Sequence, residues 1–302
     1  MTLLTTPRSR IFIASAAFVF AAALCFLFIH RMSDVEAAKG AIATGDPLVA
    51  AQLASEQPPR PDSTPVLVEL FTSEGCSSCP PADALLARLN RTQPVAHADV
   101  IGLEEHVDYW DSLGWKDRFS SHDLTVRQSG YARRLRLEDI YTPQMIIDGT
   151  NQFVGNDDAY ALRAIAHAAQ APKLALSLSQ PSISDGRLTA SASLAQPHAS
   201  IPNADVFAAL VEPSASTQVL KGENGGHTLQ HVSVVRSLQR VGSLADLAAT
   251  PLKFSLNIPK DASSSLRVVV FVQSANQGAI LGAATSAPAA TPRFSTSVAA
   301  LH

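Results

Sequence analysis

Charged residues are scarce in this sequence of 302 residues. Asp, Glu, Lys and Arg make up 16% of it, the net charge is −3, and no long basic segment occurs. Because a nucleic-acid partner needs a concentrated positive surface, we expect no nucleic-acid binding. Apolar residues make up 46% of the chain, so we expect buried cores and no wholesale disorder.

Long apolar runs are also rare, and the clearest one lies near the N-terminus. Residues Ile11 to Ile29 are all apolar or small, and Arg8 and Arg10 precede them. A helix of this length spans roughly 28 Å, close to the thickness of a bilayer core. It predicts either an uncleaved membrane anchor or a signal peptide cleaved near Val35 and Ala37. Both alternatives predict export to the periplasm or cell envelope, with an inner-membrane anchor if the helix is retained.

Cysteine occurs only three times. Cys25 lies in the apolar run, where it is an apolar filler, and Cys76 and Cys79 are separated by two serines. In an exported protein, this second pair faces an oxidising space in which disulfides persist. The pair alone is compatible with a redox couple, half of a metal site or a structural staple.

The segments that follow differ in their periodicity. Strands alternate with helices from 65 to 171, which predicts an α/β layer with parallel pairing. Short period-two segments separated by turns predict an antiparallel β-sandwich. The predicted parts are a signal peptide or anchor at 1–36, a linker at 37–64, an α/β domain at 65–171, a β-sandwich domain at 172–284 and a flexible tail at 285–302.

Several local elements can be placed more closely. A helix is predicted from about Ser121 to Leu135, and its arginines are expected to form a solvated face (Arg127, Arg133, Arg134 and Arg136). A later helix is expected to be capped by Asn156 or Asp157. The segment "LKGENGGHTL" is predicted to be a hairpin turn, because Asn-Gly-Gly supplies the backbone angles that such turns need.

The pair Cys76 and Cys79 stands between a buried strand, "VLVELF", and a helix that begins at "PPADALLARLN". Free backbone N–H groups and the positive end of the helix dipole stabilise an anion at this position. Such a position lowers a thiol pKa, so we expect Cys76 to be a reachable, attacking thiolate. Cys79 would then be the resolving thiol.

These features resemble the thioredoxin superfamily over about residues 66–169. A second hallmark is Thr142-Pro143 directly before the strand "QMIID". The resemblance implies that Pro143 is cis and that Thr142 and Pro143 contact substrate peptides. More narrowly, "VELFTSEGCSSCPPAD" and "YTPQMIIDG" resemble an exported bacterial thioredoxin-like family catalogued as a domain of unknown function. Gly75 and Pro80 depart from typical thioredoxins, which carry an aromatic residue before the first cysteine.

Three further residues are candidates for the site. Glu69 lies on the buried strand, where desolvation raises a carboxyl pKa and suits a proton acceptor for Cys79. His106 and Trp110 lie in a loop expected at the sheet edge that bears Cys76, where His106 could move protons and Trp110 could contact substrate. The alternatives are that Glu69 faces water, the aromatic residues pack the loop and His106 caps it.

We therefore expect thiol–disulfide exchange on exported proteins or small-molecule thiols, through Cys76 and Cys79. No cofactor and no resident metal are expected. One alternative is a binding module that is not an enzyme, with a structural disulfide. Another is a copper-handling protein, because two thiolates and His106 would suit Cu(I). His227 and His231 have the spacing of a zinc half-site but belong to the predicted β-sandwich.

Overall fold

The computed structural model describes residues 62–196 and 202–289. The predicted membrane anchor or signal peptide and most of the linker lie outside these residues. Within the described part of the chain, no helix has the length and apolar character needed to cross a membrane.

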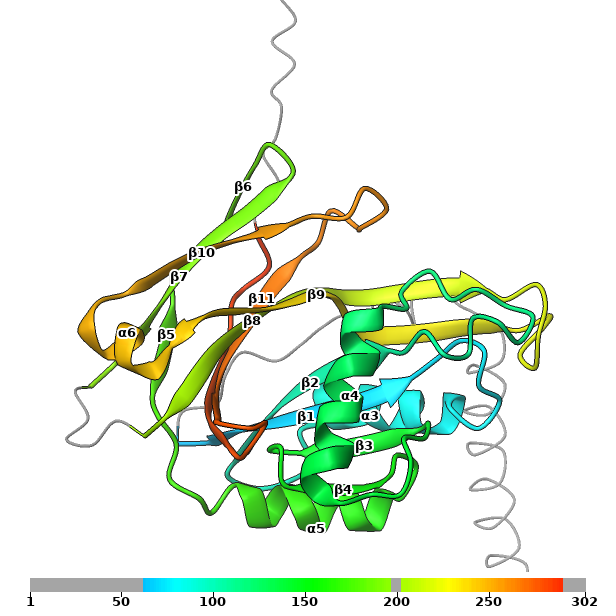
Figure 1. The fold of residues 1–302 in the computed structure, drawn as a ribbon, viewed down its shortest axis with the longest axis horizontal. Coiled ribbons are helices and arrows are strands. Elements are labelled where there is room, and N and C mark those ends of the chain that lie inside the picture. Colours follow the sequence, from blue (N-terminus) through cyan, green and yellow to red (C-terminus); the bar gives the residue numbers. More distant parts are fainter. Residues whose placement is uncertain (1–61, 197–201, 290–302) are drawn as a thin grey trace, which may run out of the picture. The chain divides into compact units, whose positions relative to one another are not determined.

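The elements follow one another as a mixed α/β chain (Figure 1). The helices are α3 (Pro80–Thr92), α4 (His122–Leu135), α5 (Asp158–Ala168) and α6 (Leu244–Ala249). The first four strands are β1 (Thr64–Thr72), β2 (Ala98–His106), β3 (Gln144–Ile147) and β4 (Asn151–Val154). The others are β5 (Leu176–Leu178), β6 (Ser182–Ser184), β7 (Arg187–Leu194), β8 (Ala204–Gln218), β9 (Thr228–Ser243), β10 (Leu252–Asn257), β11 (Arg267–Ser274) and β12 (Ile280–Thr285).

A large sheet of eight strands runs through the molecule in the order β12-β11-β8-β9-β2-β1-β3-β4. Strands β1 and β2 pair in parallel. Strand β3 pairs antiparallel with β1, and β4 pairs antiparallel with β3. Strand β9 joins the free edge of β2 in parallel, through Glu104 and Val234. Four of the strands predicted for a separate β-sandwich, β8, β9, β11 and β12, therefore extend the same sheet as β1 to β4.

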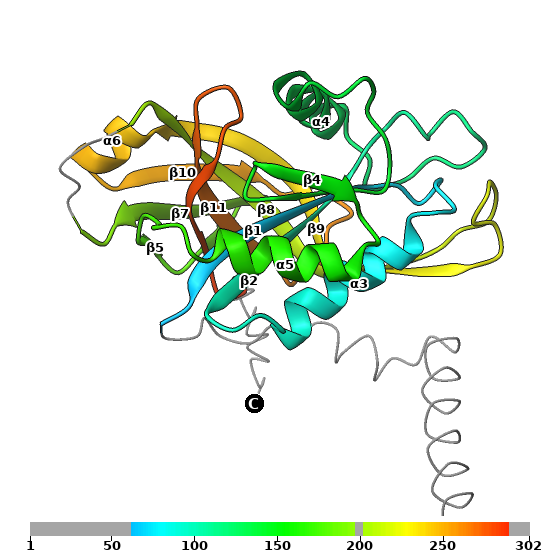
Figure 2. The ribbon, with the colours of Figure 1, turned by 90° about the horizontal axis from the view of Figure 1, so that it is seen from below.

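Helices cover both faces of the β1–β4 part of this sheet (Figure 2). Helices α3 and α5 pack on one face, where Leu86 and Ile165 meet Val68. Helix α4 packs on the other face, where Tyr131 meets Phe71. Strand β1 can be a nearly continuous apolar run because both of its faces are covered.

A smaller sheet, ordered β10-β7-β5 with β6 beside β7, packs against the second half of the large sheet. Leu188 and Leu256 from the small sheet share a core with Val206 and Val270 from the large one. The segment predicted as a tail is described as far as residue 289. The Ser286 amide donates to the Val268 carbonyl of β11, and the Ala289 amide donates to the carbonyl of Leu266, just before β11.

Several local predictions are confirmed. Helix α4 begins after Ser121, whose hydroxyl accepts from the Asp123 amide, and ends at Leu135. Helix α5 has Asp157 as its N-cap. The peptide bond between Thr142 and Pro143 is cis. The predicted turn "LKGENGGHTL" joins β8 to β9.

Candidate functional site

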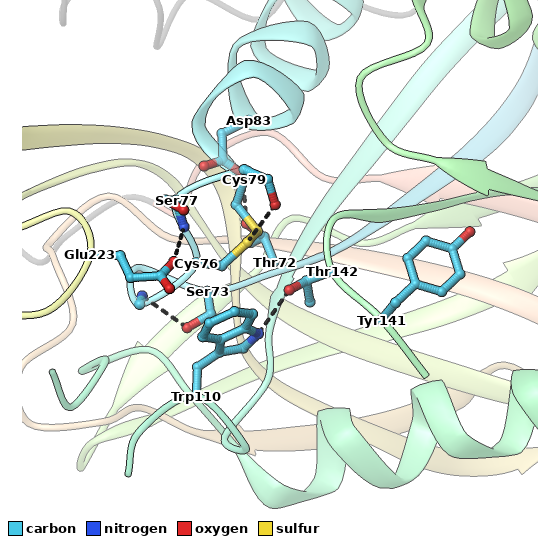
Figure 3. Close-up of a disulfide and its surroundings, with 12 residues drawn as sticks. Thr72, Ser73, Cys76, Ser77, Cys79, Asp83, Trp110, Tyr141, Thr142 and Glu223 are labelled. Carbon is cyan, nitrogen blue, oxygen red and sulfur yellow. Dashed lines mark hydrogen bonds between the residues drawn. A yellow bond between two sulfur atoms is a disulfide. The ribbon is translucent and has the colours of Figure 1, made fainter. Parts of the chain in front are cut away.

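A disulfide joins Cys76 and Cys79, with an S–S distance of 2.14 Å (Figure 3). Cys76 follows the end of β1, and Cys79 is the N-cap residue of α3. Pro80 and Pro81 occupy the first helical turn, where a missing N–H leaves no bond unmade. The predicted strand, sharp loop and helix are thus all present. The sulfurs lie at the helix end that favours negative charge.

The disulfide is more buried than we expected. Cys76 and Cys79 are both 0% exposed, although Ser77 and Ser78 between them are exposed. The Cys76 sulfur lies 3.4 Å from the Ser78 hydroxyl. The expectation of a reachable Cys76 therefore does not hold for this oxidised, closed arrangement.

The cover comes from the connection between β8 and β9, residues 219–227, which we call the covering loop. The Asn224 amide is buried and donates to the backbone carbonyls of Glu74, at 2.9 Å, and Cys76, at 3.0 Å. The Ser77 amide donates to the Glu223 carboxylate at 3.0 Å (Figure 3). In Figures 1 and 2 the long yellow hairpin reaches the cyan segment between β1 and α3. A segment about 150 positions away thus closes the cysteine loop.

Trp110 connects the cysteine loop to the cis-proline segment. Its indole N–H donates to the Thr142 hydroxyl at 2.8 Å (Figure 3). A Cβ atom built on Gly75 would lie only 3.2 Å from the Trp110 Cβ. Gly75, the departure from the thioredoxin pattern, therefore leaves the space that Trp110 fills. The Pro143 carbonyl accepts from the Gly155 amide at 2.9 Å.

Glu69 is not placed to take a proton from Cys79. Its carboxylate accepts from the Arg127 Nε at 2.6 Å and from the Tyr131 hydroxyl at 2.6 Å, both on α4. Helix α4 covers the face of the sheet opposite to α3. Arg127, which we expected in a solvated face, is buried for the same reason. Burial and the neighbouring Glu69 carboxylate also raise the pKa of Glu105 well above its usual value.

His106, by contrast, lies on the α3 side of the sheet, at the end of β2 and in register with Thr72. Its Nδ1 is 2.6 Å from an Asp117 oxygen, and its Nε2 is 3.3 Å from a Glu104 oxygen. Burial disfavours the charged imidazole, but Asp117 and Glu104 outweigh it and raise the pKa of His106 well above its usual value. His106 was predicted to lie in a loop, but it is the last residue of strand β2.

Asp83, a buried acid on the helix that Cys79 caps, was not among the residues predicted for the site. Asp83 lies one helical turn after Cys79 and accepts from the Thr72 hydroxyl at 2.7 Å. Burial, helped by the negative charge of Glu104, raises the pKa of Asp83 to about 7. The spacing of four residues between Cys79 and Asp83 on one helix could have revealed it.

Asp83 belongs to a larger set of buried polar side chains under the cysteine loop and the start of α3. We call this set the buried polar cluster: Glu74, Asp83, Glu104, His106, Asp117 and His231. His231 enters it because β9 pairs with β2, and its Nδ1 lies 2.6 Å from a Glu104 oxygen. The residue that we had assigned to another domain is therefore in contact with Glu104.

The members of this cluster perturb one another strongly. Burial opposes ionisation of Glu104, but the two imidazoles outweigh it and lower the pKa of Glu104 to about 2. Burial likewise disfavours charged His231, whereas Glu104 raises the pKa of His231 to about 9. Ligand atoms from Glu104, His106 and His231 all lie within 4.8 Å of one another. These three residues could hold a metal ion.

The comparisons with known proteins give a family and a similar structure. The crystal structure of Protein AGR_C_4864 from Agrobacterium tumefaciens is similar to this chain, with 29% sequence identity and a TM-score of 0.55. The match covers 76% of this chain and 96% of that one. A DUF3823 family protein from Bacteroides ovatus matches at 16% identity over 38% of this chain and 54% of its own. Its TM-score of 0.25 is too low to support an argument. No curated protein matches.

A family model also matches this chain. It confirms one part of the narrower resemblance described above, namely that the chain contains a domain of unknown function. It extends over residues 67–273, from within β1 to one residue before the end of β11. It therefore includes the cysteine loop, the covering loop and every member of the buried polar cluster. The chain belongs to the family described as "Protein of unknown function (DUF1223)".

Proposed function

We propose that this protein is an exported, thioredoxin-like thiol–disulfide oxidoreductase whose cysteine pair is shielded by the covering loop. Its substrates would be dithiols or disulfides of other exported proteins or of small molecules. The observation that carries the proposal is the Cys76–Cys79 disulfide at the N-terminus of α3, with Trp110 joining its loop to Thr142. No organic cofactor is required, because the sulfurs carry the electrons.

The order of the elements supports the thioredoxin-like part of the proposal. The chain runs β1-α3-β2-α4-β3-β4-α5, and these strands are ordered β2-β1-β3-β4 in the sheet. The cis peptide bond precedes β3, which pairs antiparallel with β1. A cis-proline edge next to a Cys-x-x-Cys helix is what the resemblance noted in the sequence implies.

The proposed reaction transfers two electrons by two exchange steps. In the oxidising direction, a substrate thiolate attacks the Cys76 sulfur, the bond between Cys76 and Cys79 breaks, and Cys79 leaves as a thiolate. A second substrate thiolate then attacks the substrate sulfur of the mixed disulfide, and Cys76 leaves. The substrate becomes a disulfide and the enzyme a dithiol. The reducing direction is the reverse of these steps.

Asp83 would manage the proton of Cys79 in this reaction. It is the acid one helical turn from Cys79, and its pKa of about 7 allows it to give or take a proton near neutral pH. A carboxylic acid that gives its proton to the leaving Cys79 sulfur makes this sulfur a better leaving group. Asp83 thus replaces Glu69 and His106 as the proposed proton carrier.

Burial of the pair favours a rival, a binding module that is not an enzyme and whose disulfide only holds the loop. Against this rival, the bridge spans a sequence separation of only three residues. Closing so short a loop stabilises a fold by only about 2 kcal/mol in the chain-entropy description. A staple at this position contributes little, whereas a redox pair needs this close spacing.

The reduction potential separates the two functions. Full-length protein carrying Cys25→Ser would be equilibrated in dithiothreitol or glutathione buffers of graded potential, quenched with acid and labelled with a maleimide. The proposal predicts a potential above about −300 mV, and a structural staple predicts one below it. In addition, Cys79→Ser should form a stable mixed disulfide with glutathione at Cys76, whereas the matched variant Cys76→Ser should not. A potential below that value, with no adduct in Cys79→Ser, would refute the proposal.

A further inference from the structure

We propose that the buried polar cluster contains a binding site for one divalent metal ion such as Zn(II), with Glu104, His106 and His231 as the protein ligands. The inference does not rest on the proposed redox function, because neither Cys76 nor Cys79, which are joined in the disulfide, is a ligand of the ion. It differs from the copper alternative considered for the sequence, since its ligands are nitrogen and oxygen atoms. Such ligands suit Zn(II) rather than Cu(I).

The first support is the convergence of ligand atoms from distant parts of the chain. Glu104 and His106 lie two residues apart on β2 and therefore point to the same face of the sheet. His231 comes from β9, and the ligand atoms of the three residues lie within 4.8 Å of one another. In tetrahedral zinc sites, with bonds of about 2.1 Å, neighbouring ligand atoms are about 3.4 Å apart. Small side-chain shifts would therefore close the site around an ion.

The second support is a set of buried atoms that have no hydrogen-bond partner. Among the described residues, these include His106 Nε2, His231 Nε2 and Glu74 Oε1, although His106 Nε2 lies 3.3 Å from a Glu104 oxygen. All three side chains are fully buried, and His231 Nε2 and Glu74 Oε1 face each other at 3.5 Å. An unpaired buried polar atom costs about 1–3 kcal/mol. An ion bound by Glu104, His106 and His231 would give these imidazoles a partner, whereas Glu74 lies outside this group of ligands.

The third support is the second layer of contacts, which holds the ligands in place. Asp117 lies 2.6 Å from His106 Nδ1, and its oxygens also accept from the Glu74 and Phe119 amides. A carboxylate on the far nitrogen orients a metal-binding imidazole and makes its other nitrogen a stronger ligand. The Trp115 indole donates to Glu74 at 2.7 Å, which leaves Glu74 Oε1 directed at His231.

The charge of the site also suits a cation. Four carboxyl groups and two imidazoles are gathered in the buried polar cluster, and each of these side chains is at most 5% exposed. Buried carboxylates are retained in proteins when a cation or a metal compensates them. In the described part of the chain no arginine or lysine contacts these six side chains, so the compensating charge comes from protonated His106 and His231 or from a bound ion.

The test uses full-length oxidised protein carrying Cys25→Ser, stripped with a chelator and then freed of it. Zn(II) binding would be measured by calorimetry and metal analysis, and Co(II) would serve as a visible probe of four-coordinate geometry. We expect one equivalent of either ion. X-ray absorption of the zinc-loaded protein should show nitrogen and oxygen ligands with imidazole scattering and no sulfur. No binding, or sulfur in the ligand shell, would overturn the inference.

Variants locate the site. His231→Gln should reduce zinc affinity by at least about 100-fold, whereas the matched control His227→Gln, exposed and from the same "HTLQH" segment, should bind as the parent does. Asp117→Asn, a positioning change, should reduce affinity about 10- to 100-fold. Binding retained in a folded His231→Gln protein would refute the site. Should that variant unfold, the absorption spectrum of the parent protein decides, because it needs no substitution.

Discussion

Asn224→Ala tests whether the covering loop controls access to the disulfide. The Asn224 amide donates two buried hydrogen bonds, to the carbonyls of Glu74 and Cys76. Each hydrogen bond contributes about 1 kcal/mol, and a buried carbonyl left without a partner costs somewhat more. We therefore expect the loop to open more easily by about 2–3 kcal/mol. This corresponds to an increase of about 30- to 150-fold in the open population.

The rate of disulfide reduction reports this opening. When opening and closing are fast compared with attack by dithiothreitol, the rate is proportional to the open population. Oxidised full-length protein with Cys25→Ser would be mixed with dithiothreitol. Samples would be quenched at intervals with a maleimide that changes the mobility of Cys76 and Cys79 on a gel. Asn224→Ala should be reduced about 30- to 150-fold faster than its parent.

The neighbouring variant Glu223→Ala is the matched control. Its carboxylate accepts one bond from the Ser77 amide at an exposed position, so its loss should change the rate only slightly. Urea unfolding of each variant would separate loop opening from global destabilisation. If the reduction rate of Asn224→Ala stayed within about threefold of its parent, the covering loop would not be the barrier that shields Cys76.

Three further predictions concern buried groups and backbone geometry. Relative to wild type, Asp83→Asn should be equally stable near pH 4 and more stable above pH 7, by up to about 4 kcal/mol. The reason is that the Asp83 carboxyl keeps its proton up to about pH 7 in the folded protein but loses it near pH 3.8 in the unfolded chain. Urea titrations between pH 4 and 8 measure this difference, and a difference that does not vary with pH would contradict it. Glu69→Gln should lose about 3 kcal/mol of unfolding free energy, since it removes the closer of the two carboxylates beside the buried charge of Arg127 and leaves only Glu105, 3.7 Å from the Arg127 Nε; a loss below about 1 kcal/mol would show that the pair is dispensable. Gly149→Ala should lose more stability than Gly226→Ala. Both glycines have positive φ, but only at Gly149 would the added Cβ meet a backbone carbonyl, at 2.4 Å; equal losses in thermal melts would argue against that clash.

Local structure was predicted well from the sequence because its causes lie close together in the chain. Ser121 and Asp157 cap α4 and α5 through amides two and three residues away, respectively. In the turn at 219–227, Gly222 and Gly226 supply the positive φ angles, which is a local property. The disulfide partners are separated by two residues, so their pairing is also a local property.

The direction of buried polar side chains was harder to predict. An apolar strand covered on both faces has no polar side to show its orientation. Glu69 could therefore be assigned to the cysteine side, although it faces Arg127 on α4. The burial of Arg127 could not be predicted either. On a helix, an arginine that pairs with a buried acid has the same spacing in the sequence as an arginine that faces water. Asp83 was overlooked because acids are common in the first turn of any helix.

The sequence by itself determined the order of strands and helices from β1 to α5, two of the helix caps, the position of Cys76 and Cys79 before α3, and the turn between β8 and β9. Only the tertiary structure decided that β9 lies against β2, that His231 meets Glu104, and that Asn224 covers Cys76. The physical reason is that caps and turns depend on neighbours within a few residues. Pairing at a free sheet edge depends instead on contacts between residues more than a hundred positions apart, and no local pattern specifies which edge a strand will join.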